Sequence, residues 1–227
     1  MLRGRDAGKD QSYFLWGIER SVLERLVLPI GTQTKAETRE IARRFGLRTA
    51  EKIESQDICF VPDGDHVRVI REHLGADAPA LQRGPLRLVS GEVVGEHEGF
   101  ARYTIGQRRG LPGGFAAPMF VVDIVPDERA VVIGPREALL GRGLEARELN
   151  WMADAPQVGD AVQVQVRNRA KPSPATVLRI DDRGIELALD EPIQAISPGQ
   201  SVVLYDGEVV LGGGVIEKGR RVLPQFS

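Results

Sequence analysis

The chain has 227 residues, of which 42% are hydrophobic and 27% are charged, and its net charge is −2 at pH 7. This is the composition of a globular protein with enough apolar surface for two or more modest cores. The net charge excludes a strongly basic nucleic-acid-binding chain, so any phosphate contacts must come from a local basic face. The single cysteine excludes an internal disulfide and no apolar stretch reaches membrane-spanning length, so we expect a reducing, cytoplasmic setting and no membrane partner.

The first predicted element is an amphipathic helix over residues 10–28. Its apolar side chains recur at every fourth position, which places them along one helix face. They are Phe14, Ile18, Val22 and Leu26. Asp10 is the predicted N-cap, and Pro29 and Gly31 end the helix.

Two further helices are predicted. Thr34 and Glu37 form a capping-box pattern that begins a helix ending at Gly46. Asp65 is a candidate N-cap for a third helix, which ends at Gly75. Because three short helices without a sheet make a poor core, we expect this region to expose apolar side chains such as those of the first helix, and to associate or dissolve poorly in isolation.

The helical pattern stops after Pro79, and short strands take over. Two pairs of apolar runs, each around turn residues, predict two hairpins. The pairs are residues 86–89 with 92–94 and residues 120–124 with 130–133.

From residue 144 onward, the sequence alternates with period two between turn signals. Val162, Val164 and Val166 are expected on one strand face, and Gln163, Gln165 and Arg167 on the other. Further runs lie at 175–180, 184–189, 201–205 and 209–216. Strands at this spacing predict a small antiparallel barrel, and the fold class is therefore α+β.

Cys59 can be interpreted in two ways from its neighbours. A lone cysteine between Ile58 and Phe60 is usually a small buried hydrophobe. The alternative is a reactive thiol, for which His66 is the nearest histidine in sequence. Asp57 either orients this segment or raises the pKa of the thiol by repulsion.

Three other segments also have a structural and a functional interpretation. Residues 9–11 are either a helix start or a place where phosphate and base edges are held. Residues 167–172 form a basic loop that is either merely solvated or in contact with RNA. Residues 107–109 are either a turn between two glycines or a basic contact near RNA. His97 between two glutamates is a weak metal signal, and we predict no metal site.

Four sequence motifs occur in order along the chain and together resemble those of a known family. They are Lys-Asp-Gln-Ser-Tyr-Phe-Leu at 9–15, Ser-Gln-Asp-Ile-Cys-Phe at 55–60, Tyr-Thr-Ile-Gly-Gln-Arg-Arg-Gly-Leu at 103–111 and Ser-Pro-Gly-Gln at 197–200. With Leu-Gly-Gly-Gly-Val-Ile at 211–216, they resemble the tRNA-specific 2-thiouridylases of the MnmA type. These enzymes place sulfur at position 2 of the wobble uridine of certain tRNAs.

The resemblance implies roles for individual residues. Cys59 corresponds to the cysteine that carries sulfur as a persulfide. The residues matching tRNA contacts are Lys9, Asp10, Gln11, Arg169, Ala170 and Gln200. Arg108 and Arg109 are expected near the RNA backbone. Alanine at position 170 is a departure from the family, and a stacking contribution is not expected there.

The resemblance also implies an organisation. Residues 1–75 correspond to the C-terminal, helical part of an α/β nucleotide-binding catalytic domain. Residues 76–142 form a small β-rich central domain, and residues 143–227 form the tRNA-binding barrel. The Ser-Gly-Gly-x-Asp-Ser loop that binds ATP, with Mg, in these enzymes does not occur in the chain, nor does their second cysteine.

Two functions follow as expectations. In the first, the chain is a fragment or truncated gene product of the enzyme, inactive without the missing N-terminal domain and supplied with sulfur by a cysteine desulfurase or a sulfur-relay protein. In the second, it is a non-catalytic tRNA-binding module in which Cys59 is a relic.

Overall fold

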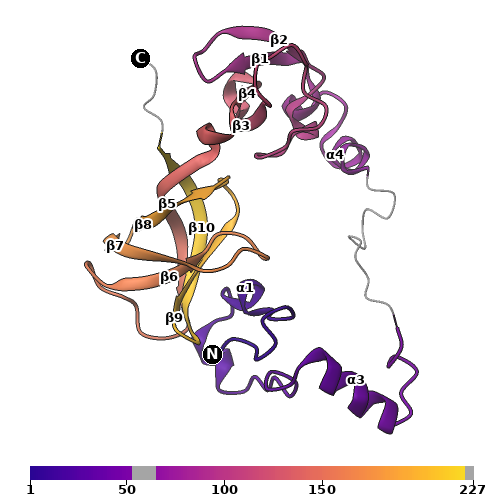
Figure 1. The fold of residues 1–227 in the computed structure, drawn as a ribbon, viewed down its shortest axis with the longest axis vertical. Helices are drawn as coiled ribbons and strands as arrows, with labels where there is room; N and C mark the ends of the chain where they lie inside the picture. The colour runs from indigo at the N-terminus through magenta and orange to yellow at the C-terminus, as the bar shows by residue number, and fades with distance from the viewer. Residues whose placement is uncertain (53–64, 223–227) are drawn as a thin grey trace. The chain divides into compact units, whose positions relative to one another are not determined.

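The computed structural model describes residues 1–52 and 65–222 and divides into two compact units (Figure 1). The first unit combines Met1–Glu54 with Arg142–Pro192 and Ile196–Arg220. The second combines Ser55–Gly141 with Ile193–Ala195 and Arg221–Ser227. These units group residues by contact, so the domain boundaries proposed after residues 75 and 142 stay a prediction.

The helix predicted over residues 10–28 is wrong, because the structure has two four-residue helices there. They are α1 (Ser12–Leu15) and α2 (Arg20–Leu23). The physical reason is Asn150, whose Nδ2 donates to the carbonyls of Trp16 at 2.6 Å and Ile18 at 2.9 Å. In a continuous helix, carbonyls two residues apart lie on opposite sides of the axis, so one amide nitrogen reaches both only where the backbone is not helical.

The capping box predicted at Thr34 is confirmed at the start of α3 (Lys35–Arg44). The Thr34 hydroxyl accepts from the Glu37 amide at 3.2 Å, and the Glu37 carboxylate accepts from the Thr34 amide at 2.6 Å. The chain leaves the helix through Gly46 at φ +63°, a left-handed conformation that favours glycine.

The predicted barrel is confirmed as a closed sheet of six strands in the order β10-β5-β8-β7-β6-β9. The strands are β5 (Leu140–Trp151), β6 (Ala161–Gln165), β7 (Ser173–Asp181), β8 (Gly184–Gln194), β9 (Ser201–Asp206) and β10 (Val209–Arg221). Val164, Leu187 and Leu204 are among its fully buried side chains. The α+β fold class with a C-terminal barrel is therefore confirmed.

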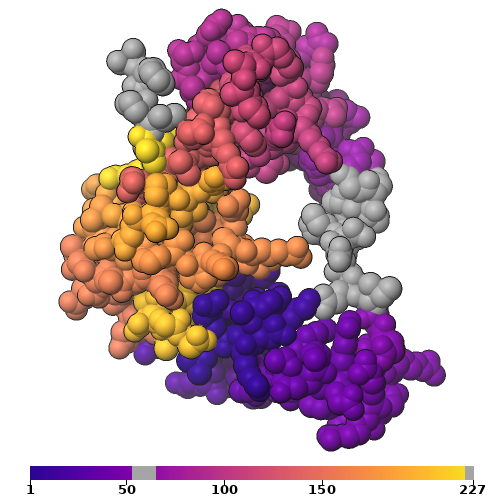
Figure 2. Space-filling view, viewed as in Figure 1, coloured from indigo at the N-terminus to yellow at the C-terminus, as the bar shows by residue number. Residues whose placement is uncertain are grey.

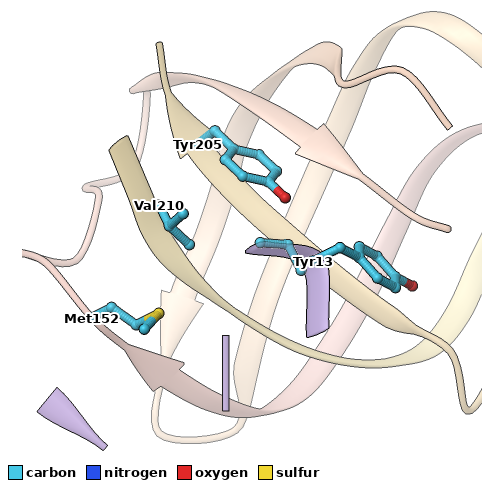
Figure 3. Close-up of a cluster of buried hydrophobic side chains, with 5 residues drawn as sticks. Tyr13, Met152, Tyr205 and Val210 are labelled. Carbon is cyan, nitrogen blue, oxygen red and sulfur yellow. The ribbon is translucent and has the colours of Figure 1, made fainter. Parts of the chain in front are cut away.

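The N-terminal segment packs on the barrel, contrary to the expectation of helices without a sheet (Figures 1 and 2). Leu2 forms an antiparallel bridge with Val209 of β10. A buried cluster joins this segment to β9 and β10 (Figure 3). Its members are Tyr13, Met152, Val203, Tyr205 and Val210, with Met1, Trp16, Ile18 and Leu23 packed against them. Phe14 is 57% exposed, as expected, whereas Ile18 and Leu26 are half-buried.

The second unit is built on a four-stranded sheet in the order β2-β1-β4-β3. The strands are β1 (Gly84–Leu88), β2 (Val93–His97), β3 (Phe120–Val125) and β4 (Ala130–Gly134). Both predicted antiparallel pairs are confirmed, and β1 also pairs with β4 in parallel, which the sequence did not indicate. The third predicted helix is α4 (His66–Leu74), capped by the Asp65 carboxylate on the Arg68 amide. No helix in the described ranges is long and apolar enough to cross a membrane.

His97 is buried in this unit, and both of its ring nitrogens are hydrogen-bonded. Nδ1 accepts from the Gly99 amide at 3.1 Å, so Nε2 carries the proton and donates to the Arg129 carbonyl at 2.9 Å. Burial lowers the pKa of His97, while the hydrogen bond to Arg129 acts in the opposite direction. The geometry is that of a structural, neutral histidine.

We expect the second unit to lose stability as the pH falls below about 6.5, the pKa of unfolded histidine. The unfolded chain then takes up a proton that folded His97 resists, and the loss ends below the lowered folded pKa. The slope contributed by this one group is at most about 1.4 kcal/mol per pH unit. Urea unfolding between pH 5 and 8 measures it, and His97→Gln should flatten the slope. An equal slope in the two proteins would contradict the assignment.

Candidate nucleic-acid interface

Two of the predicted tRNA-binding segments leave the barrel at one end. In the β6–β9 pair, Gln163 lies opposite Tyr205 and Gln165 opposite Val203. Continuing this antiparallel register places Arg167 beside Ser201. The basic loop (residues 167–172) that follows β6 and the Gln200 that precedes β9 therefore emerge together.

The N-terminal turn (residues 9–11) reaches the same end of the barrel. Tyr13 of α1 donates its hydroxyl to the Ser201 carbonyl at 2.9 Å, and Ser12 lies against Tyr205. Figure 3 shows Tyr13 and Tyr205 in this cluster, the first from the N-terminal segment and the second from β9. Lys9 and Gln11 are exposed beside this anchor.

Asp10 differs from its neighbours because its side chain is only 8% exposed. Oδ1 accepts from the amides of Gly4 and Ser12, and Oδ2 accepts from the Ser12 hydroxyl and Arg3 Nε. Burial alone would raise the pKa of Asp10, but these four hydrogen bonds outweigh it and the pKa lies below its usual value. The expectation that Asp10 caps a helix is wrong, since Gln11 holds the N-cap position of α1.

The basic loop presents its charges to solvent. Arg167, Arg169 and Lys171 are exposed, and none of them pairs with a carboxylate in the described part of the chain. On the barrel wall, by contrast, Arg179 pairs with Asp181 at 2.6 Å. Ala170 is half-buried, and its amide donates to the Arg167 carbonyl at 3.0 Å, which folds the loop into a tight turn.

Residues 107–109 lie in the second unit, whereas the segments above belong to the first. The Gln107 side chain is occupied within its own loop, accepting from the Thr104 amide and donating to the Arg109 carbonyl. Gly106 and Gly110 both have positive φ, at +89° and +79°. Arg108 and Arg109 are exposed, and their RNA contact stays a prediction.

Cys59 and the rest of its sequence motif lie outside the described residues. Its role as persulfide carrier therefore stays a prediction from the resemblance. Within residues 1–52 and 65–222, no three His, Cys, Asp or Glu side chains are grouped as metal ligands would be.

The sequence did not single out several residues that hold the interface together. Gln165 was expected on the outer face of β6, but it is only 5% exposed and bonded to the Tyr205 hydroxyl. Arg3 places its guanidinium 5.0 Å from the centre of the Tyr205 ring. No local pattern signals these contacts, because each joins residues that are far apart in the chain.

Comparison with known proteins gives matches over most of the chain. Three family models match, described as the tRNA methyl transferase HUP domain at residues 1–63, the tRNA methyl transferase PRC-barrel domain at 69–135 and the aminomethyltransferase beta-barrel domain at 141–216.

Three similar relatives carry the name tRNA-specific 2-thiouridylase MnmA. The protein of Carboxydothermus hydrogenoformans is 44% identical over 96% of this chain and 59% of its own length. The protein of Geobacter metallireducens is 43% identical over 96% of this chain and 58% of its own length. The protein of Clostridioides difficile is 41% identical over 92% of this chain and 58% of its own length. The chain thus spans less than two thirds of these relatives, and by the identities and the three matches it belongs to the MnmA-type tRNA-specific 2-thiouridylase family.

Proposed function

We propose that this chain forms the tRNA-binding and sulfur-carrying part of a tRNA-uridine 2-sulfurtransferase. The observation that carries the proposal is the convergence of the N-terminal turn, the basic loop and Gln200 at one end of the barrel. The N-terminal turn is more than a hundred residues from the other two segments in sequence, yet all three present an ammonium, guanidinium groups and amides to the same region of solvent.

The chemistry of this surface suits RNA. Exposed arginine and lysine side chains neutralise phosphates, and guanidinium groups do so with two parallel hydrogen bonds. The amides of Gln11 and Gln200 can donate to and accept from base edges or ribose hydroxyls. We assign phosphate contacts to Lys9, Arg169 and Lys171, and leave Ala170 as a small residue that allows close approach.

Cys59 is proposed as the sulfur carrier. Its thiolate attacks the terminal sulfur of a donor persulfide, so that an S–S bond forms on Cys59 and the donor thiolate leaves. When that sulfur attacks an activated uridine C2, a C–S bond forms and the activated oxygen leaves with its activating group. A second thiolate then attacks the Cys59 sulfur, which breaks the S–S bond, leaves sulfur on C2 and joins the two cysteines in a disulfide. Cys59 is the only cysteine of these 227 residues, so the second thiol comes from outside them.

Other requirements of the reaction are likewise proposals. No Ser-Gly-Gly-x-Asp-Ser loop occurs in the sequence, so the residues present do not fit ATP with Mg. The donor is proposed to be a cysteine desulfurase or a sulfur-relay protein in the cytoplasm. A binding module without catalysis remains the competing proposal, and sulfur loading of Cys59 separates the two.

Replacing Arg169 with alanine is expected to weaken tRNA binding about five- to tenfold at physiological salt, because one charge-assisted phosphate contact is lost. The plot of log affinity against log salt should become shallower by about one unit. Filter binding or fluorescence anisotropy with an unmodified tRNA across a salt series measures both quantities.

Arg183 provides the matched control. It is an exposed arginine in the turn between β7 and β8, at the opposite end of β7 from the basic loop. Arg183→Ala should leave affinity and salt slope unchanged. The proposal fails if the two variants behave alike, or if the wild-type chain binds tRNA no better than a neutral protein.

A further inference from the structure

Three buried polar residues stand between the N-terminal segment and the basic loop. Ser12 is 3% exposed, Gln165 is 5% exposed and Tyr205 is fully buried. Burying such groups is unfavourable unless each finds a hydrogen-bond partner. The hydrogen-bond partners of these three residues therefore identify the segments that they stabilise.

Gln165 holds the start of the basic loop. Its Nε2 donates to the backbone carbonyls of Arg167 at 3.0 Å and Asn168 at 2.7 Å. Its Oε1 accepts from the Tyr205 hydroxyl at 3.1 Å. Both amide protons of one buried side chain are thus used on the loop backbone, and Tyr205 fixes which way the amide points.

Tyr205 also contacts the N-terminal segment. Its ring lies under the Arg3 guanidinium, which donates through Nε to Asp10, the middle residue of the N-terminal turn. Its hydroxyl oxygen lies 3.4 Å from the Ser12 hydroxyl, which itself binds Asp10 at 2.9 Å. Tyr205 of β9 therefore contacts both Gln165, which holds the basic loop, and Arg3 and Ser12, which hold the N-terminal turn.

A proton count shows which of these contacts are hydrogen bonds. Ser12 and Tyr205 each have one hydroxyl proton, and the shorter contacts direct these protons to Asp10 and to Gln165. The 3.4 Å contact between the two hydroxyl oxygens is left without a proton and is longer than a normal O–H···O bond. Tyr205 therefore supports the loop by hydrogen bonding and the N-terminal segment by packing.

We propose that Tyr205 and Gln165 are positioning residues of the tRNA surface, which fix the basic loop relative to the N-terminal turn without touching RNA. The inference rests on the proposed function. Its physical basis is preorganisation: a loop already ordered before binding loses less conformational entropy when it meets the RNA. Removing the support should lower affinity but leave the number of phosphate contacts, and hence the salt slope, unchanged.

Tyr205→Phe tests this, because it deletes the hydroxyl and keeps the ring. We expect tRNA affinity to fall about three- to tenfold at every salt concentration, with a parallel salt plot, since one hydrogen bond that orders the loop is lost. Gln165→Leu should have a similar effect, and the double variant should lose little more than either single variant. Amide hydrogen exchange of residues 168–171, measured without RNA, should accelerate in both.

Val177→Ala is the matched control, since Val177 is buried in the same barrel on β7 and its backbone bonds to Gly159 and Asp160, which precede β6, whereas the basic loop follows β6. It should lower the unfolding midpoint while leaving the affinity of the folded protein and the loop exchange unchanged.

The inference is overturned if Tyr205→Phe leaves loop exchange unchanged, or if Val177→Ala reduces affinity equally. Should the wild-type chain fail to bind tRNA, the proposed function fails, and the loop exchange still decides the positioning role: faster exchange in Tyr205→Phe supports it, and unchanged exchange overturns it.

Discussion

Replacing Cys59 with serine is expected to abolish loading of the protein with sulfane sulfur. The acceptor of a persulfide sulfur must be a thiolate, because a serine hydroxyl remains protonated at neutral pH and forms no S–S bond. The chain has a single cysteine, so the wild type can take up at most one sulfur as a cysteine persulfide, and the variant none. The expected effect is a complete loss rather than a partial one.

The measurement is transfer of radiolabelled sulfur from a cysteine desulfurase charged with labelled cysteine, followed by non-reducing electrophoresis. The label of the wild type should be released by a reducing agent, as expected for a persulfide. Ser55→Ala changes the same sequence motif and keeps the thiol, so it should load like the wild type.

Equal labelling of Cys59→Ser and the wild type would contradict the proposal that Cys59 carries the sulfur. It would leave the binding proposal, which depends on the barrel, intact. Loss of label together with intact tRNA binding would support a sulfur carrier that also binds tRNA.

Local signals in the sequence predicted local structure well. The capping box at Thr34 and Glu37 needs only four consecutive residues to specify its two hydrogen bonds, and α3 begins there. The hairpins and the barrel strands were also predicted, because alternation of apolar side chains and turn residues acts within a few positions.

Predictions failed where residues distant in sequence compete with the local pattern. The stripe from Phe14 to Leu26 indicated one helix, yet Asn150, more than a hundred residues away, donates to two carbonyls that a continuous helix would hold on opposite sides of its axis. Likewise, alternation places Gln165 outside the barrel, but the N-terminal segment and Tyr205 cover that position. The site residues came from sequence motifs, whereas the contacts that order them came only from the structure.

Replacing Gly213 with alanine is expected to destabilise the first unit strongly. A Cβ at this position would lie 2.6 Å from the Val202 carbonyl oxygen and 2.9 Å from the Trp16 ring. The carbonyl belongs to the paired strand β9 and the indole belongs to the N-terminal segment. The added methyl group therefore fits only if β9 and β10 move apart or if the N-terminal segment moves away from the barrel. Overpacking of this kind destabilises by about 3 kcal/mol.

Urea unfolding gives the change in stability, and Trp16 fluorescence in a Trp151→Phe background reports whether the N-terminal segment leaves the barrel. Gly17→Ala is the control, since Gly17 follows the same tryptophan and a Cβ there would meet nothing within 4 Å. It should be neutral or stabilising by about 0.5 kcal/mol.

The fluorescence distinguishes two ways in which the close approach can be relieved. A red-shifted, more quenched Trp16 means that the segment has detached, and tRNA affinity should then fall because the N-terminal turn no longer lies beside the basic loop. An unchanged Trp16 spectrum with lower stability means that the strand ladder has yielded instead, and affinity should persist in the folded protein. Unchanged stability with an unchanged spectrum would contradict the tight packing of Trp16 on β10, on which the placement of the N-terminal turn depends.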